Sequence, residues 1–126
     1  HIWYVCDKHK IATYIYYFEN KNISLIQYAV FYGSIQIFGY LRLNGVELDP
    51  SLWLYSIHGN NAEIISLLEE NNVQPDDTTY KKCLEESIKF HHNDIANYII
   101  NNLMTQENEN VINSRCFRYY NFAFFP

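Results

Sequence analysis

An internal repeat is the feature that most limits how this chain can fold, because a repeated segment is one supersecondary unit copied along the chain. The segment that begins at Ser24 matches the one that begins at Ser51, and Tyr28 falls on Tyr55, 27 positions later. A third copy follows with a period of 31 when the loop around Pro75 is lengthened. A unit this short cannot bury its own apolar face, so we expect successive units to pack against one another.

Each copy has the pattern of two short helices joined by a tight turn. Serine is strongly preferred at the N-cap of a helix, so Ser24 and Ser51 are predicted to cap the first helices of their copies. Gly33, Asn60 and the stretch 91–93 follow that helix, and glycine or asparagine readily takes the left-handed conformation that such a corner needs. We therefore predict that the first helix ends at these positions.

The second helix of each copy carries apolar residues with i, i+3, i+4 spacing, which predicts one buried face. They are Ile37, Tyr40 and Leu41, then Ile64, Leu67 and Leu68, then Ile95, Tyr98 and Ile99. In the first two triplets, the isoleucine and the last leucine are expected to be almost fully buried. Asn44-Gly45 and Asn71-Asn72 are expected to end these helices.

The first copy also carries the residues of a known repeat pattern. They are Ser24, Tyr28, Ala29, Gly33, Ile35, Ile37, Tyr40, Leu41, Asn44 and Gly45. This pattern resembles the ankyrin repeat, whose consensus runs Thr-Pro-Leu-His-x-Ala, then a glycine, a Glu-Ile-Val core, a Leu-Leu pair and a closing glycine. It is similar to a divergent ankyrin-like family that is expanded in some parasitic protists. The resemblance covers residues 10–103 and, more faintly, 115–126.

The resemblance implies an all-α, ankyrin-like helix-turn-helix repeat solenoid. The Thr-Pro-Leu-His tetrapeptide is absent, and a period of 27 is shorter than the usual one of about 33 residues. We therefore expect short or absent β-hairpin fingers. We predict one domain over 1–126, with a partial repeat at 1–22, repeats at 24–50, 51–77 and 78–105, and a partial repeat at 111–126.

Charge and cysteine content limit the classes of partner and the cellular setting. The formal net charge is −5, whereas nucleic-acid binders present a basic face, so no nucleic acid is expected. Cys6, Cys83 and Cys116 lie far apart with no CxxC pair, which favours an intracellular, cytoplasmic protein. The longest apolar run, 11–18, is about half of a membrane span, so no membrane partner is expected.

A few residues have the chemistry of a metal or catalytic site. His58, His91, His92, Asp94 and Cys83 are residue types that bind zinc, but their spacing fits no standard zinc motif. We expect turn and surface histidines instead, with no metal and no cofactor. Cys83 either has a lowered pKa at the start of a helix or serves as a small buried apolar residue, and we favour the second. No catalytic residue is predicted, and an enzyme is not expected.

The resemblance places the end of each first helix on the concave surface that contacts partners. The shortened loops that replace the β-hairpin fingers are predicted to contribute further contacts. The predicted contact residues are Phe31, Tyr32, His58, Lys89 and Phe90 on the first helices, and Asp49, Asp76 and Asp77 at the loops. The predicted function is a protein–protein interaction module that binds an unknown protein. The alternative is a structural spacer within a longer array, with no ligand of its own.

The C-terminal segment, residues 116–126, is predicted to form a first helix, a turn at Asn121 and an apolar start with no second helix after it. It contains Phe117, Phe122, Phe124 and Phe125. Exposed together, they would form a larger apolar patch than a monomer usually leaves open. We predict that they either fold back on the preceding repeat or associate with a second chain, and that further repeats follow Pro126.

Overall fold

The computed structural model describes residues 23–104 and 109–124, and every regular element in these ranges is a helix. The helices are α3 (Leu25–Tyr32), α4 (Ile35–Leu43), α5 (Leu52–His58), α6 (Ala62–Glu70), α7 (Lys81–Lys89), α8 (Asn93–Tyr98), its π-helical continuation η1 (Ile99–Leu103) and α9 (Glu109–Arg118). None of these described helices is long and apolar enough to cross a lipid bilayer. The all-α prediction is confirmed for these ranges. The predicted partial repeat at 1–22 lies outside them.

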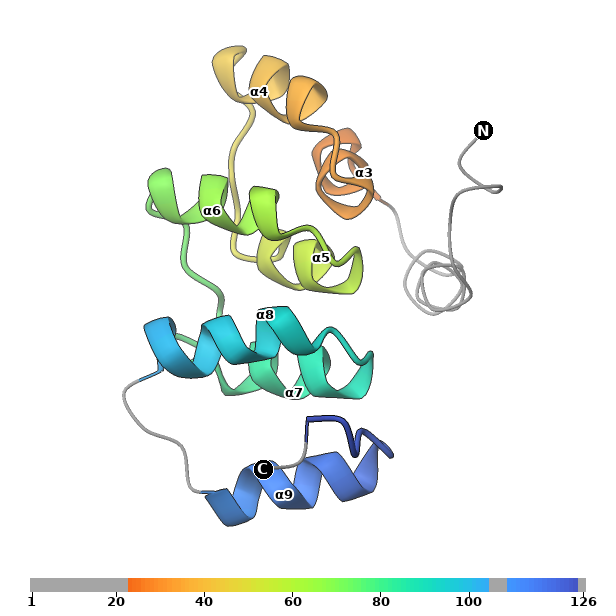
Figure 1. Cartoon of the computed structure of the whole chain (residues 1–126). Helices are drawn as coiled ribbons and strands as arrows, with labels where there is room; N and C mark the ends of the chain where they lie inside the picture. The colour runs from red at the N-terminus through yellow and green to blue at the C-terminus, as the bar shows by residue number, and fades with distance from the viewer. Residues whose placement is uncertain (1–22, 105–108, 125–126) are drawn as a thin grey trace, which may run out of the picture.

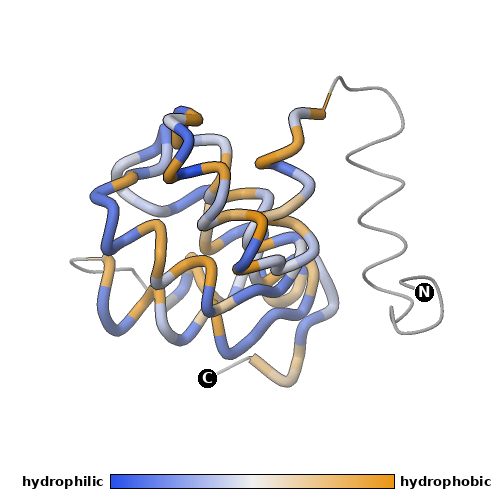
Figure 2. The backbone as a smooth tube through the Cα atoms, turned by 90° about the horizontal axis from the view of Figure 1, so that it is seen from above, coloured by the Kyte–Doolittle hydropathy of each residue, from blue (hydrophilic) through white to orange (hydrophobic). Residues whose placement is uncertain are grey.

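The helices are arranged as pairs that lie one below another, α3 with α4, α5 with α6 and α7 with α8, followed by α9 (Figure 1). In each pair the first helix packs on the second, and along the stack α3 packs on α5, α5 on α7 and α7 on α9. The first helices thus form a continuous row. Seen along the stack, hydrophobic and hydrophilic residues alternate along the helices (Figure 2), which is the pattern of helices with one buried face.

In each unit that the structure describes, the first helix ends in the same turn. Gly33, Asn60, His91 and Tyr120 have φ of 71°, 58°, 61° and 57°, so all four are left-handed. The N–H that follows each of them bonds to the carbonyl five residues earlier, Ser34 to Ala29 at 2.9 Å, Asn61 to Ser56 at 3.0 Å, His92 to Ser87 at 2.9 Å and Asn121 to Cys116 at 2.9 Å. This is the Schellman motif. The predicted turns at Gly33, Asn60 and 91–93 are confirmed, and all four acceptors are small, buried residues.

The second helices also end alike. The side-chain amides of Asn44, Asn71 and Asn102 donate to the carbonyls four residues earlier, at 2.8, 2.7 and 3.1 Å. Gly45 and Asn72 then take positive φ of 82° and 58°. The carbonyls of Tyr40 and Leu67 also accept the backbone N–H of the same asparagine, each at 3.1 Å, so the side chain adds a second hydrogen bond in the last turn of the helix. The predicted ends of the second helices at Asn44-Gly45 and Asn71-Asn72 are therefore confirmed.

An asparagine side chain joins one unit to the next at two equivalent places. Asn61 Nδ2 donates to the carbonyl of Val30 at 2.9 Å and to that of Phe31 at 2.5 Å. Asn121 Nδ2 donates to the carbonyl of Ile88 at 3.0 Å. Asn61 and Asn121 both follow the left-handed residue of their turns, and Val30 and Ile88 both follow the small acceptor residue of theirs. The same bond thus caps the first helix of the preceding unit from the next unit along.

The core is one cluster that extends from Ile26 in α3 to Cys116 in α9. Trp53 is fully buried, and its indole N–H donates to the carbonyl of Val73 at 2.8 Å, which fixes the loop after α6 against α5. Because this hydrogen bond is buried, it satisfies two polar groups that would otherwise be costly to remove from water.

The predicted burial of the second helices is confirmed in α6 and wrong in α4. Ile64 and Leu68 are both 0% exposed, whereas Ile37 is 43% exposed and Leu41 is half-buried. The residue that α4 buries is Phe38. The reason is position: within the described ranges, α4 is the end member of its row and α6 lies between α4 and α8 (Figure 1).

Candidate functional site

Two of the predicted contact residues belong to the interior. Phe31 and His58 occupy equivalent places, two residues before the left-handed turn, and both are 0% exposed. The Phe31 ring is part of the core and meets Tyr32 edge-on at 4.9 Å, and His58 meets Phe90 edge-on at 4.9 Å. The prediction that they contact a partner is therefore corrected. His58 faces the next unit along the row and not solvent.

Three other predicted contact residues on this row are half-buried. They are Tyr32, Lys89 and Phe90. The Lys89 ammonium lies 5.6 Å from the centre of the Phe90 ring and 5.8 Å from that of Tyr119, within the range of cation–π attraction. These side chains keep some surface for contact, and their role in binding stays a prediction.

The predicted loop residues Asp49 and Asp77 each form a side-chain turn in the loop before a helix, Asp49 before α5 and Asp77 before α7. The Asp49 carboxylate accepts the Ser51 N–H at 2.8 Å and also the Ser51 hydroxyl. The Asp77 carboxylate accepts the Thr79 N–H at 3.0 Å and its hydroxyl at 2.5 Å, and the hydroxyl bond lowers the pKa of Asp77. Both are Asx turns, in which the acid replaces a backbone acceptor.

The N-cap predictions divide between the two units. Ser24 is confirmed, because its hydroxyl accepts the Gln27 N–H at 3.3 Å and the Gln27 side chain accepts the Ser24 N–H at 3.0 Å, which is a capping box. Ser51 makes no such bond, and Asp49 takes the role in front of Pro50. The third predicted loop residue, Asp76, is exposed.

A buried polar group links α5 to α7. His58 Nε2 lies 3.2 Å from Glu86 Oε2, and Lys82 Nζ lies 3.0 Å from Glu86 Oε1. Burial opposes the charge of Glu86, but the hydrogen bonds from His58 and Lys82 outweigh it and lower the pKa of Glu86 to about 2. Burial lowers the pKa of His58 against the opposing pull of Glu86. Since a carboxylate only accepts, His58 Nε2 carries the hydrogen.

This arrangement predicts a loss of stability in acid. The unfolded chain protonates Glu86 near its ordinary pKa of 4.5, whereas the folded chain resists until about 2, so the stabilisation present above 4.5 is lost between these values. His58 adds a loss in the same direction, because the folded chain resists its protonation below 6.5. We expect Glu86→Gln to lower the free energy of unfolding by about 1–3 kcal/mol at neutral pH. Urea titrations across the pH range measure it, and a difference between the two proteins that does not shrink as pH falls below 4.5 would contradict the pairing.

The described residues with metal-binding chemistry do not converge. His58 is in the core, and His91 is exposed in its turn with Nε2 3.2 Å from the Tyr119 carbonyl oxygen. Across 23–104 and 109–124, no three side chains of histidine, cysteine, aspartate or glutamate are placed to hold an ion. Cys83 is 1% exposed, and burial raises the pKa of its thiol to about 12. The interpretation of Cys83 as a small buried apolar residue is confirmed.

A hollow lies beside Cys83, between the loops that precede α5 and α7. It has a volume of about 260 Å³ and an apolar base formed by Pro50, Leu54 and Pro75. Asp76, Asp77 and Lys82 stand around it, so its charges are of both signs. Two of the predicted loop residues, Asp76 and Asp77, are thus brought together here.

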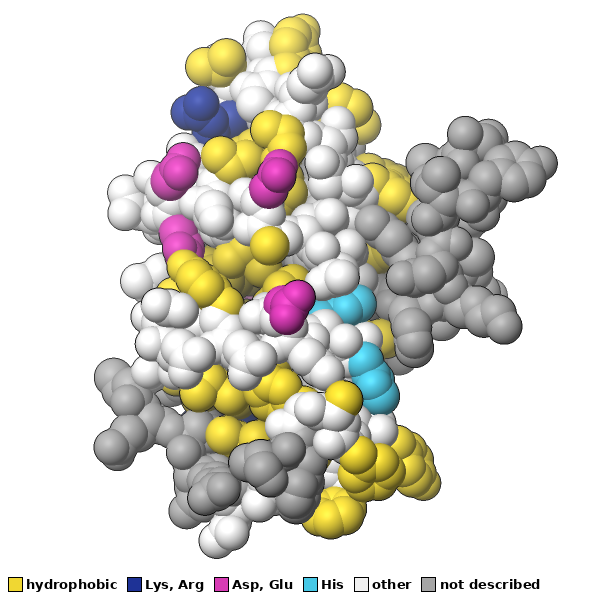
Figure 3. Space-filling model, viewed as in Figure 1, with side chains coloured by type: hydrophobic (Ala, Val, Ile, Leu, Met, Phe, Trp, Pro, Cys, Tyr) yellow, Lys and Arg dark blue, Asp and Glu magenta, His cyan; other side chains and the backbone are white. Residues whose placement is uncertain are grey.

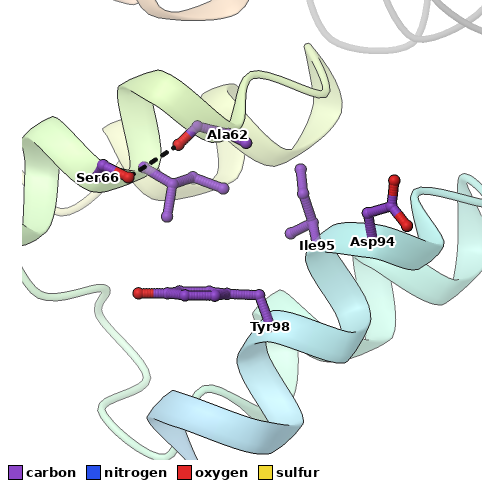
Figure 4. Close-up of a pocket in the computed structure, with 6 residues that line it drawn as sticks. Ala62, Ser66, Asp94, Ile95 and Tyr98 are labelled. Atoms are coloured by element: carbon purple, nitrogen blue, oxygen red, sulfur yellow. Dashed lines mark hydrogen bonds between the residues drawn. The ribbon is translucent and has the colours of Figure 1, made fainter.

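A second hollow, of about 230 Å³, lies between the second helices α6 and α8. Ala62, Ile65 and Ser66 line one side, and Ile95, Tyr98 and Asp94 line the other (Figure 4). In the close-up the Tyr98 ring lies across the gap below Ala62 and Ser66, and Ile95 points into it. We call this hollow the α6/α8 groove. It opens because Ala62 and Ser66 are small.

The Tyr98 ring is held in place from the neighbouring unit. Its hydroxyl donates to both carboxylate oxygens of Glu69, at 2.7 and 3.0 Å. This bond joins α8 to α6 across the groove and fixes the ring that closes one side. The groove was not predicted. The signal for it in the sequence is the pair of small residues one helical turn apart in α6, at 62 and 66, facing an aromatic residue in the next unit.

The aromatic residues at the C-terminal end remain largely at the surface. Phe117 is 59% and Phe122 is 57% exposed, and their ring centres are 5.8 Å apart. Phe124 is half-buried and packs against the core, and Phe125 lies outside the described residues. Of the two predicted alternatives, Phe124 shows the first, because it folds back on the core. Association of the other phenylalanines with a second chain stays a prediction.

Comparison with known proteins gives one match. Residues 43–126 match the family described as "Domain of unknown function (DUF3447)". The chain belongs to this family. No curated protein and no solved structure matches the chain. The DUF3447 match begins at the last residue of α4 and includes α5 to α9, so it contains the α6/α8 groove, the loop hollow and three of the four left-handed turns.

Proposed function

We propose that this chain is an ankyrin-like helical repeat solenoid that serves as a protein–protein interaction module. One observation carries the proposal: the same left-handed turn, with the same backbone bond behind it, recurs at Gly33, Asn60, His91 and Tyr120. Equivalent helix pairs joined by equivalent bonds are what a repeat array requires, since each unit depends on its neighbours for burial. Stacked repeats present extended surfaces, and such surfaces serve to bind other proteins.

The charge and the cysteines agree with an intracellular binding role. A net charge of −5 opposes binding to nucleic acid, so the partner in this proposal is a protein. Cys83 and Cys116 are free thiols in the core, which suits a reducing compartment. The cytoplasm is such a compartment.

The test is a selection from a displayed library of protein fragments, with the bound fragments sequenced and their affinities measured. Two variants each change one surface and are expected to leave the fold intact. Lys89→Glu changes the surface of the first helices, and Ser66→Arg changes that of the second helices. We expect selected fragments to lose about tenfold in affinity for one variant, since few residues carry most of the energy of an interface. Both variants should melt as the parent does. If the selection returns no fragment that binds the parent, the chain is a spacer and not a binding module.

A further inference from the structure

The α6/α8 groove is apolar inside and acidic at its rim. Its walls are formed mainly by Ala62, Ile65, Ile95 and the Tyr98 ring. Figure 3 shows hydrophobic side chains in the hollow between α6 and α8, with acidic side chains on both helices. Asp94 of α8 lines the groove, and Glu69 of α6 holds the Tyr98 ring that closes one side of it. Neither α6 nor α8 with η1 contains a lysine, arginine or histidine.

From this geometry we infer that the α6/α8 groove binds a short segment of a partner protein in which one or two apolar side chains are flanked by lysine or arginine. The inference rests on the proposed interaction function and names its surface and the chemistry of its ligand. The apolar side chain enters between Ala62, Ile65 and Ile95, and the cations lie against the acidic rim.

The size of the groove favours a side-chain anchor. At about 230 Å³ it is smaller than the pockets of roughly 300–1,000 Å³ that take whole small molecules. It is large enough for one or two aliphatic side chains. An apolar anchor seated in a pocket, with weaker polar contacts around it, is the usual organisation of a protein interface.

The charges decide which segment fits. The carboxylates of Asp94 and Glu69, one on each helix beside the groove, attract cationic flanks and repel acidic ones, which gives specificity as well as faster association. The loop hollow near Cys83 lacks this property, because Asp76, Asp77 and Lys82 give it both signs. Glu69 is already fixed by the Tyr98 hydroxyl, so part of the acidic rim is ordered before a ligand arrives.

Fluorescence anisotropy with three labelled peptides tests the inference. The first peptide has two leucines flanked on each side by two lysines, the second has glutamates in place of the lysines, and the third has serines in place of the leucines. We expect the first to bind about tenfold more tightly than either of the others. Its binding should weaken at least about threefold when salt rises from about 50 to about 300 mM, because the cationic flanks are screened.

Two variants of equal charge show where the first peptide binds. Ser66→Arg places a long side chain in the groove, and we expect it to weaken binding about tenfold. Asn97→Arg adds the same charge to α8 at an exposed residue that does not line the groove. The affinity of this variant for the first peptide should stay within about twofold of that of the parent at about 300 mM salt. Equal affinity for all three peptides, or equal effects of the two variants, would overturn the inference.

The outcome separates this inference from the broader proposal. If displayed fragments bind and lose affinity only for Lys89→Glu, the chain is an interaction module that uses another surface, and the α6/α8 groove is not its site. If fragments lose affinity for Ser66→Arg but lack basic flanks, the surface is right and the proposed ligand chemistry is wrong.

Discussion

Replacing Gly59 by alanine is expected to lower the free energy of unfolding by about 3 kcal/mol, because the new methyl group has no room. A Cβ at this position would lie 1.9 Å from the Phe31 carbonyl oxygen and 2.6 Å from Asn61 Nδ2. The first atom is backbone and cannot rotate away, so the two units would have to separate and the Asn61 bond would be disturbed. The backbone of Gly59 has φ −79° and ψ −8°, which alanine adopts freely, so the effect measures the close approach alone.

Gly39→Ala is the matched control. Gly39 lies inside α4, and a Cβ there meets no atom within 4 Å. The same substitution should therefore stabilise the protein by about 0.5–1 kcal/mol, through the higher helix propensity of alanine. Urea denaturation of the three proteins gives both values. Two changes of the same sign, or a Gly59→Ala protein as stable as the parent, would contradict the close contact between units.

Leu68→Ala should cost about 2–5 kcal/mol, since a fully buried leucine leaves a cavity that its neighbours fill only in part. Leu68 is 0% exposed between the units. Leu41 occupies the equivalent place in α4 but is half-buried, and Leu41→Ala should cost only about 1 kcal/mol. Thermal melts of the two variants compare the two positions directly. Equal losses would show that α4 is covered as α6 is.

Local signals account for the part of the fold that could be predicted. The turns at Gly33 and Asn60 follow from residues that tolerate positive φ, and the period of the sequence fixes which helices are equivalent. The predicted cap at Ser51 is wrong, although the sequence contains the signal for the residue that takes its place. Proline is favoured at the first position of a helix, so Pro50 marks that position. Asp49, which directly precedes Pro50, is therefore a better candidate for the cap than Ser51.

The direction of the contact residues could not be read from the repeat. Phe31 and His58 are expected at a partner-binding surface, yet both point into the core because each first helix packs on the next. Their burial depends on how closely α3, α5 and α7 approach, which no local pattern records. The α6/α8 groove likewise depends on the spacing of second helices, and only the small residues Ala62 and Ser66 hint at it.

The repeat itself is the claim on which the proposed function rests, and backbone φ angles measured by nuclear magnetic resonance test it most directly. Three-bond couplings and Cα shifts of the assigned protein report φ residue by residue. We expect positive φ at Gly33, Asn60, His91 and Tyr120, near the 57–71° of the structure, with α-helical values on the residues before each of them. Negative φ at Asn60 or His91 in the folded protein would show that the units do not share one turn, and the repeat account would be wrong.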